Sequence, residues 1–328
     1  MFSSKWNRRT LLATAIAALC VTTTSAFAQK YPDKPIKIVV GFAAGGFTDV
    51  LARLIANKLQ TSLGTPVVVE NKAGATGTIG ADFVSKSPAD GYTLLMGHFA
   101  SNSVAPSLFP KLPYDPIKGF TPIIQVASTP MLLVTNAKLP VKDVKGFIEY
   151  AKKHPDELSF ASSGSGTAQH LAAAQFMIAT NTKMVHIPYK GSGAAMNDLL
   201  GGQVQINFDS PPNVLPHIGG GKLNALAITS LKRSPLMPDV PTLNESGLKG
   251  FEMNQWFGIF APPNLPKNIT TQLNKEINTI LRSPEVVEKI ASQGGEITAG
   301  SSEDLAAFLK ADIAKWAKVV KTGNITVE

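Results

Sequence analysis

Short apolar runs alternate along the chain with longer segments whose apolar residues recur at helical spacing. The run IKIVV at 36–40 is typical of a buried strand, and Leu51, Leu54, Ile55 and Leu59 form one stripe of a helix expected at 48–63. Further strands are expected at 66–70, 92–96, 131–135, 158–161, 184–187, 204–208 and 223–229, with helices at 79–87, 143–153 and 194–200. This alternation predicts an α/β fold with largely parallel sheets.

The last third of the chain has a different pattern. From about residue 256 it holds one predicted strand and then helices, the last of them opened by Ser301 and Asp304 in the spacing of a capping box. Because these helices have no sheet of their own, they are expected to pack onto an earlier domain. The sequence therefore predicts a first domain formed by residues 29–128 and 250–328, interrupted by a second domain at 129–249.

The first 28 residues have the pattern of an export signal. Lys5, Arg8 and Arg9 precede an apolar stretch at 11–19 that is too short to span a bilayer, and Ala26-Phe27-Ala28 is a small-x-small cleavage sequence. We expect cleavage after Ala28 and a periplasmic location. The arginine pair leaves the twin-arginine and the general secretory routes both open.

Composition excludes several classes of function. The single cysteine, Cys20, lies in the export signal, so the expected mature chain has no disulfide, catalytic thiol or cysteine-ligated metal. Loss of the three basic residues of that signal reduces the net charge from +8 to +5, and the remaining lysines are spread along predicted helices. No basic run is interleaved with aromatic residues, which argues against nucleic-acid binding. A hydrophobic content of 44% is sufficient for a large core.

Two glycine-bearing loops precede predicted helices and are candidates for an anion site. The first is GFAAGGFTD at 41–49 and the second is SSGSGT at 162–167, one in each predicted domain. Free backbone N–H groups at a helix start bind anions. Neither loop contains an arginine, a P-loop or a dinucleotide fingerprint, so no nucleotide or other cofactor is expected. Glycines needed only for tight strand–helix packing are the alternative.

Catalytic and metal-binding interpretations have less support. Ser165 and His170, with Asp209 as a third member, could form a hydrolase triad, although Ser165 does not lie in a nucleophile elbow. The histidines have no metal-ligand spacing, so no metal site is expected. Asp209 follows a predicted strand, and its two alternatives are a contact with the ligand and a cap for the next helix.

An ordered set of motifs resembles one known family over nearly the whole expected mature chain. They include YPDKPIKIVVGFAAGGFTDVLARLIANKL, GTPVVVENKAGATGTIGADFVSKSPADGYTLLMG, SSGSGTAQHLAAAQF and IPYKGSGAAMNDLLGGQVQINFDS. The chain resembles the Bug family of extracytoplasmic solute receptors of tripartite tricarboxylate transporters. The resemblance implies a type II periplasmic binding protein, with two α/β lobes and a ligand cleft between them.

The same resemblance implies the ligand, the partners and the binding residues. The ligand is expected to be a small carboxylate, and the partners are the two integral membrane subunits of the transporter. The protein is expected to be a monomer without enzymatic activity. The implied ligand-binding residues are Phe42, Ala44, Gly45, Gly46, Phe47, Thr48, Asp49, Ser101, Ser162, Ser163, Gly166, Thr167, His170 and Asp209.

Two questions stay open at this point. Phe47 occupies a loop position that smaller or polar residues often fill in the family, so it is expected either to crowd the cleft or to stack on an aromatic acid. The ligand class is therefore open between aliphatic and aromatic acids. A sensing receptor that docks on a signalling protein is the alternative to transport.

Overall fold

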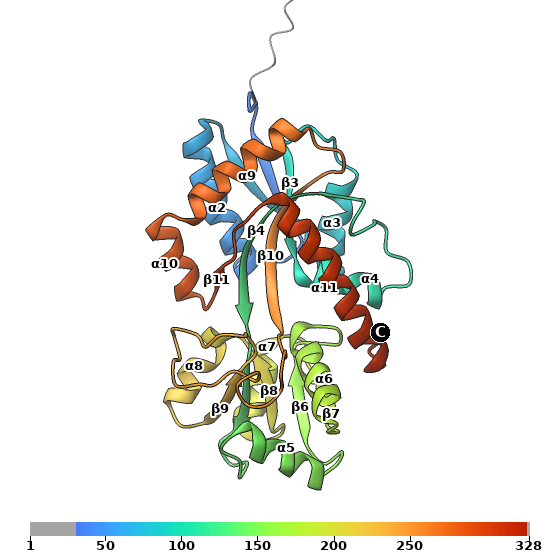
Figure 1. Ribbon diagram of the computed structural model, residues 1–328, viewed down its shortest axis with the longest axis vertical. Coiled ribbons are helices and arrows are strands. Elements are labelled where there is room, and N and C mark those ends of the chain that lie inside the picture. Colours follow the sequence, from blue (N-terminus) through green and yellow to red (C-terminus); the bar gives the residue numbers. More distant parts are fainter. Residues whose placement is uncertain (1–30, 327–328) are drawn as a thin grey trace, which may run out of the picture. The chain divides into compact units, whose positions relative to one another are not determined.

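The computed structural model describes residues 31–326. The predicted export signal and its cleavage site after Ala28 lie outside this range. The described chain forms two α/β lobes, each built on one sheet (Figure 1). Within residues 31–326, no helix has the length and apolar character needed to cross a membrane.

The first lobe contains a six-stranded sheet in the order β11-β4-β10-β3-β1-β2. Its strands are β1 (Ile36–Val40), β2 (Val67–Asn71), β3 (Thr93–His98), β4 (Thr121–Pro130), β10 (Asn254–Ala261) and β11 (Glu296–Ile297). Its helices are α2 (Phe47–Leu63), the 3₁₀ turn η1 (Ala75–Gly77), α3 (Thr78–Ser85), the π-helical turn η2 (Ala100–Val104), α4 (Ala105–Leu108), α9 (Lys267–Leu281), α10 (Pro284–Ser292) and α11 (Ser302–Thr322). The last third of the chain thus joins the first sheet, because β10 pairs with both β3 and β4.

The second lobe contains a five-stranded sheet in the order β7-β6-β8-β5-β9. Its strands are β5 (Leu132–Asn136), β6 (Ser159–Ser162), β7 (Val185–Pro188), β8 (Ile206–Asp209) and β9 (Leu223–Ile228). Its helices are α5 (Val144–Lys153), α6 (Ala168–Thr180), α7 (Ser192–Gly201) and α8 (Pro211–Gly219).

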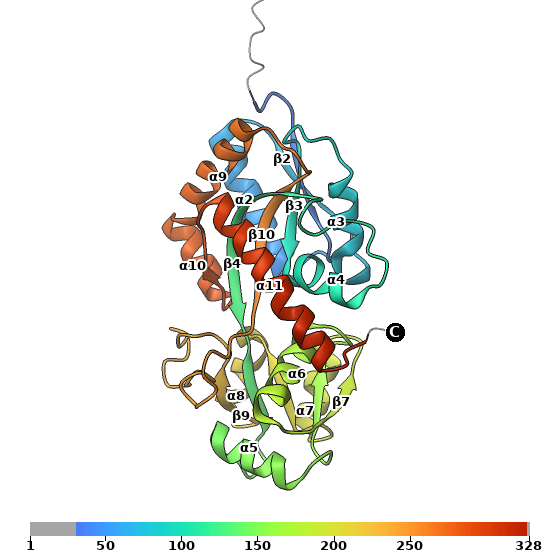
Figure 2. The same ribbon diagram turned by 45° about the vertical axis from the view of Figure 1, so that its right-hand side comes forward.

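Two antiparallel strands connect the lobes. Strand β4 continues through Met131 into β5, and β10 returns from the second lobe beside β4 (Figure 1). We call these two paired strands the hinge ribbon. Helix α11 packs along β4, η2 and α4 and also contacts α6 of the second lobe (Figure 2).

The prediction of largely parallel sheets is wrong for half of each sheet. Strands β2, β1 and β3 are parallel, as are β7, β6 and β8, whereas β4, β5, β9, β10 and β11 pair with their neighbouring strands in antiparallel fashion. In the first sheet the reason is the hinge ribbon, since a chain that crosses to the second lobe and comes back enters that sheet in the opposite direction.

Candidate functional site

A cleft of about 580 Å³ lies beside the hinge ribbon, between loops of the two lobes. The first lobe and the ribbon contribute Phe42, Gly45, Gly46, Phe47, Thr48, Thr76, His98, Ala100, Thr129, Met131, Gln255, Phe257 and Gln293. The second lobe contributes Ser163, Thr167, Ala168, Gln169, Ser192, Asp209, Ser210, Pro212 and Asn213. Neither lysine nor arginine is among these residues, and Asp209 is the one carboxylate.

The first loop is held in shape by a carboxylate behind it. Asp49 is 3% exposed, and its Oδ2 accepts hydrogen bonds from the backbone N–H of Gly45 (3.0 Å) and from Nε of Arg53 (2.8 Å). The hydrogen bond from Arg53 is the main reason that the pKa of Asp49 falls to about 2, against the opposing effect of burial. Asn71 donates to Oδ1 of Asp49 (2.9 Å) and to the carbonyl of Phe42 (3.0 Å). Asp49 therefore braces the loop and does not line the cleft.

The second loop is braced in a similar way by neutral groups. Ser162 Oγ lies 2.6 Å from Nε2 of His186, and the Gly166 N–H donates to Nδ1 of His170 (3.1 Å). The two imidazole rings stack with their centroids 3.8 Å apart. Burial lowers the pKa of both histidines to about 4, so both rings are neutral at pH 7.

Three helix starts at the cleft have no side-chain cap. Helix α2 begins after Gly46, α6 after Thr167 and α7 after Gly191, and none of these three residues caps its helix with a side chain. Thr167 Oγ1 donates instead to the carbonyl of Gly164 (2.7 Å). Residues 46–48, 167–169 and Ser192 all line the cleft. The first-turn N–H groups and the positive ends of three helix dipoles therefore favour an anion.

The fourth helix start, that of α8, differs because it already has an internal anion. Asp209 is 2% exposed, and its Oδ1 accepts hydrogen bonds from the Ser210 N–H (2.8 Å) and from Nδ2 of Asn213 (3.0 Å). Asn207 Nδ2 donates to Oδ2 (3.2 Å). Burial raises the pKa of Asp209. Asp209 borders the cleft, but most of its hydrogen-bonding capacity is used by the protein.

Aromatic rings form the part of the cleft nearest β3 and β10. The ring of His98 lies 4.6 Å from that of Phe42 and 5.1 Å from that of Phe257, measured between centroids. His98 Nδ1 accepts the N–H of Ala100 (3.0 Å), and burial lowers the pKa of His98 to about 4. Phe47 packs edge-on against Phe257 at 5.0 Å. The ring of Phe47 thus borders the cleft while it is supported by the first lobe.

The structure brings eight of the sequence-predicted residues to the cleft wall and leaves six outside it. The eight are Phe42, Gly45, Gly46, Phe47, Thr48, Ser163, Thr167 and Asp209. The six are Ala44, Asp49, Ser101, Ser162, Gly166 and His170. Of these, Asp49, Ser162 and His170 brace the loops, and Ser101 Oγ donates to Oδ1 of Asn102 (2.7 Å).

Several polar residues of the cleft wall are not among the residues predicted from the sequence. Thr129 and Gln255 lie on the hinge ribbon, and no local pattern marks them. Thr76, with a left-handed φ of 57°, and Asn213 were also missed. Ser192 had a detectable signal, since PYKGSG at 188–193 is a third glycine-bearing strand–helix junction.

The hydrolase interpretation has no matching geometry. Nδ1 of His170 accepts a backbone N–H, and Asn207, Ser210 and Asn213 donate to Asp209. Within residues 31–326 no hydrogen bond joins Ser165 to His170, or His170 to Asp209. The same described residues contain no group of three or more His, Cys, Asp or Glu side chains that could hold a metal ion.

Residues 51–325 match the family model described as "Tripartite tricarboxylate transporter family receptor". The chain belongs to this family. It is 43% identical over 299 residues to Protein BugT of Bordetella pertussis, covering 90% of each chain. Among solved structures it is similar to the periplasmic binding protein BugD, with 40% identity and a TM-score of 0.75, over 91% of this chain and 100% of that one.

A second solved structure of the family contains a ligand. This is R. palustris Rpa4515 with adipate, which is 36% identical to this receptor, with a TM-score of 0.79, over 91% of this chain and 100% of that one. The receptor thus has the fold of the periplasmic binding proteins of the Bug type, and its relatives include one whose ligand is a small carboxylate.

Proposed function

We propose that this receptor captures a small carboxylate in its cleft, in the periplasm, and delivers it to the two membrane subunits of a tripartite tricarboxylate-type transporter. The observation that carries the proposal is the set of three uncapped helix starts at a cleft lined by neither lysine nor arginine. Such a cleft binds an anion through backbone N–H groups and hydroxyls. The family and the adipate complex of a relative support a carboxylate in particular.

In this proposal one carboxylate of the ligand lies between the starts of α2 and α6. Gly46, Phe47 and Thr48 supply N–H groups from the first lobe, and Ala168 does so from the second, since the Thr167 N–H already donates to the carbonyl of Gly164 (3.3 Å). Because the two starts belong to different lobes, a bound carboxylate favours closure. The receptor acts as a monomer and catalyses no reaction. The lobes are assigned as residues 29–128 with 250–328, and 129–249.

Several of the remaining sequence-predicted residues support the cleft without contacting the ligand. Asp49, Ser162, Gly166 and His170 hold the two loops in shape through the hydrogen bonds described above. Asp209 holds the amide of Asn213 and the start of α8. A ligand hydroxyl or ammonium group is favoured beside Asp209, because either can donate a hydrogen bond to a carboxyl oxygen and an ionised ligand carboxylate cannot.

Thermal unfolding of residues 29–328 against a panel of acids tests the function. The panel contains hexanoate, adipate, citrate, benzoate and terephthalate, and the matched controls are the amides of the same acids. A ligand at a hundred times its Kd adds about 2.7 kcal/mol of stability. This corresponds to a rise in Tm of roughly 4 °C, because the unfolding entropy of about 300 residues is about 0.6 kcal/mol/K. The amides should give no shift.

The proposal fails if no acid raises Tm and mass spectrometry of the denatured protein finds no co-purified carboxylate. A shift produced equally by acids and their amides would also contradict it, since binding would then not depend on the negative charge.

A further inference from the structure

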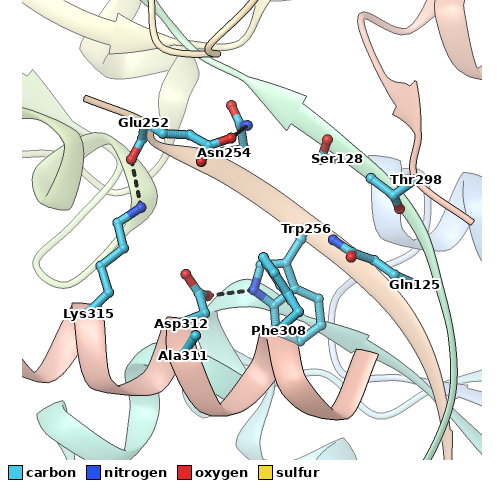
Figure 3. Close-up of a pocket in the computed structure, with 10 residues that line it drawn as sticks. All are labelled: Gln125, Ser128, Glu252, Asn254, Trp256, Thr298, Phe308, Ala311, Asp312 and Lys315. Atoms are coloured by element: carbon cyan, nitrogen blue, oxygen red, sulfur yellow. Dashed lines mark hydrogen bonds between the residues drawn. The ribbon is translucent and has the colours of Figure 1, made fainter. Parts of the chain in front are cut away.

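The hinge ribbon separates two cavities. Thr129 of β4 and Gln255 of β10 are paired, and both line the ligand cleft. The next pair, Ser128 and Trp256, lines a second pocket of about 470 Å³ (Figure 3). Successive side chains of a strand point to opposite faces, so the cleft and this pocket lie on opposite faces of the same two strands. We call the second cavity the back pocket, and its lining residues are Gln125, Ser128, Glu252, Asn254, Trp256, Thr298, Phe308, Ala311, Asp312 and Lys315.

One wall of the back pocket is α11, which is fixed to the first lobe. Asp312 of α11 is 8% exposed and accepts hydrogen bonds from two indoles, Trp256 Nε1 (2.8 Å) and Trp316 Nε1 (2.9 Å). The ring of Trp316 packs edge-on against Phe99 at 4.9 Å. At the helix start, Ser302 Oγ donates to the carbonyl of Ile123 (2.9 Å). These contacts indicate that α11 moves with the first lobe.

Lys315 of α11 reaches across the back pocket to the second lobe. Its Nζ donates to the carbonyl of Glu252 (2.6 Å; Figure 3). Nε2 of Gln175 on α6 donates to the same carbonyl (3.3 Å). Met253, the next residue, is fastened to the end of β9 because its N–H donates to the carbonyl of Thr229 (3.1 Å) and its carbonyl accepts Thr229 Oγ1 (2.5 Å). Glu252 lies within the 250–328 segment, but these contacts fasten residues 252 and 253 to the second lobe, so the first lobe begins a few residues later than position 250. Lys315 therefore joins the two lobes behind the ribbon.

We propose that Lys315 holds the receptor open and so sets its ligand affinity without touching the ligand. Closing the lobes over the ligand bends the hinge ribbon toward the cleft face. The back face then widens, and the Lys315–Glu252 hydrogen bond is stretched or broken. Closure has to overcome this contact, so the fraction of receptor in the closed, high-affinity state is lower while the contact exists. Lys315 therefore acts on binding through the position of the two lobes and not through contact with the ligand.

Lys315→Met removes the donor and keeps the apolar stem of the side chain. We expect it to bind the ligand roughly tenfold more tightly, as loss of one charge-assisted hydrogen bond from the open state predicts. Ala311→Phe, which fills the back pocket and keeps its walls apart, should act in the same direction. The matched control is Lys318→Met, on the exposed side of the same helix, which should stay within twofold of the wild type.

Two measurements decide the question, and only the first rests on the proposed function. Isothermal titration with the acid that gives the largest Tm shift compares the Kd values of the four proteins. Small-angle scattering without ligand compares their radii of gyration, and Lys315→Met should have a smaller radius than Lys318→Met. Tighter binding together with a smaller radius supports the inference.

Equal or weaker binding by Lys315→Met, with an unchanged radius of gyration, overturns the inference. If the wild type binds no carboxylate, the proposed function fails, and the scattering comparison alone decides the role of Lys315. Equal radii would then overturn it.

Discussion

The uncapped start of α6 allows the proposed carboxylate site to be tested by supplying an anion from the protein itself. Thr167 is the N-cap residue, with φ −72° and ψ 164°, and its hydroxyl donates to Gly164 instead of accepting a helix N–H. Aspartate in this backbone conformation caps a helix well. Thr167→Asp should therefore place a carboxylate on the N–H groups that we assign to the ligand.

The expected effects on stability and on binding differ in size. Capping contributes about 0.5–2 kcal/mol, and loss of the Thr167–Gly164 hydrogen bond costs about 1 kcal/mol, so the free energy of unfolding should change little. Two carboxylates about 4 Å apart at an effective dielectric constant of about 20 repel each other by about 4 kcal/mol. Solvent in the open cleft reduces this repulsion, and we expect a loss of affinity of roughly a hundredfold or more.

Thr167→Asn is the matched control, because asparagine has the same shape as aspartate and also caps helices but has no charge. Titration calorimetry gives the Kd of each variant, and urea unfolding gives its stability. A Kd of Thr167→Asp within tenfold of that of Thr167→Asn would refute the placement of the ligand carboxylate at α6. A common loss in both variants would mean that the threonine hydroxyl, and not the helix start, is what the ligand needs.

Three further predictions concern stability. Burial lowers the pKa of the stacked His170 and His186 to about 4, below the value of roughly 6.5 in an unfolded chain. The unfolded state therefore takes up protons first, and the free energy of unfolding falls as the pH drops from about 6.5 toward 4. A free energy of urea unfolding that is the same at pH 7 and pH 5 would contradict this. Gly41→Ala would place a methyl group 2.6 Å from the carbonyl oxygen of Gly77, and the forced backbone shift should cost about 1–3 kcal/mol in thermal unfolding. Asp312→Asn leaves one of two buried indole N–H groups without an acceptor, and a loss of about 1–3 kcal/mol is expected in urea unfolding; an unchanged midpoint would show that one oxygen serves both indoles.

Most strands and helices could be predicted from the sequence because each is encoded locally. The IKIVV run and the Leu51–Leu59 stripe predict β1 and α2 to within one residue. Strand β4 was missed because Pro122, Pro130 and polar residues interrupt its apolar pattern. Ser128 and Thr129, two of these polar residues, each line one of the two cavities beside the hinge ribbon.

Residues of the cleft could be predicted only where they are close together in the sequence. The two glycine-bearing loops were found because the loop and the helix start are adjacent in sequence. Gln255 and Thr129 are opposite each other on two strands that are 126 positions apart in the chain, so only the fold brings them together. Asp49 and His170 were assigned to the ligand because the sequence cannot show on which side of a loop a side chain lies.

The shared carboxylate of Asp312 has a spectroscopic consequence. Within residues 31–326 tryptophan occurs only at positions 256 and 316, and both indole N–H groups donate to Asp312. Trp256 lies on β10 between Gln255 and Phe257, which border the ligand cleft on the other face of the strand. Any turn of β10 against α11 changes the polar environment of both indoles at once. The receptor therefore contains its own optical reporter, and intrinsic fluorescence should follow ligand capture without an added dye.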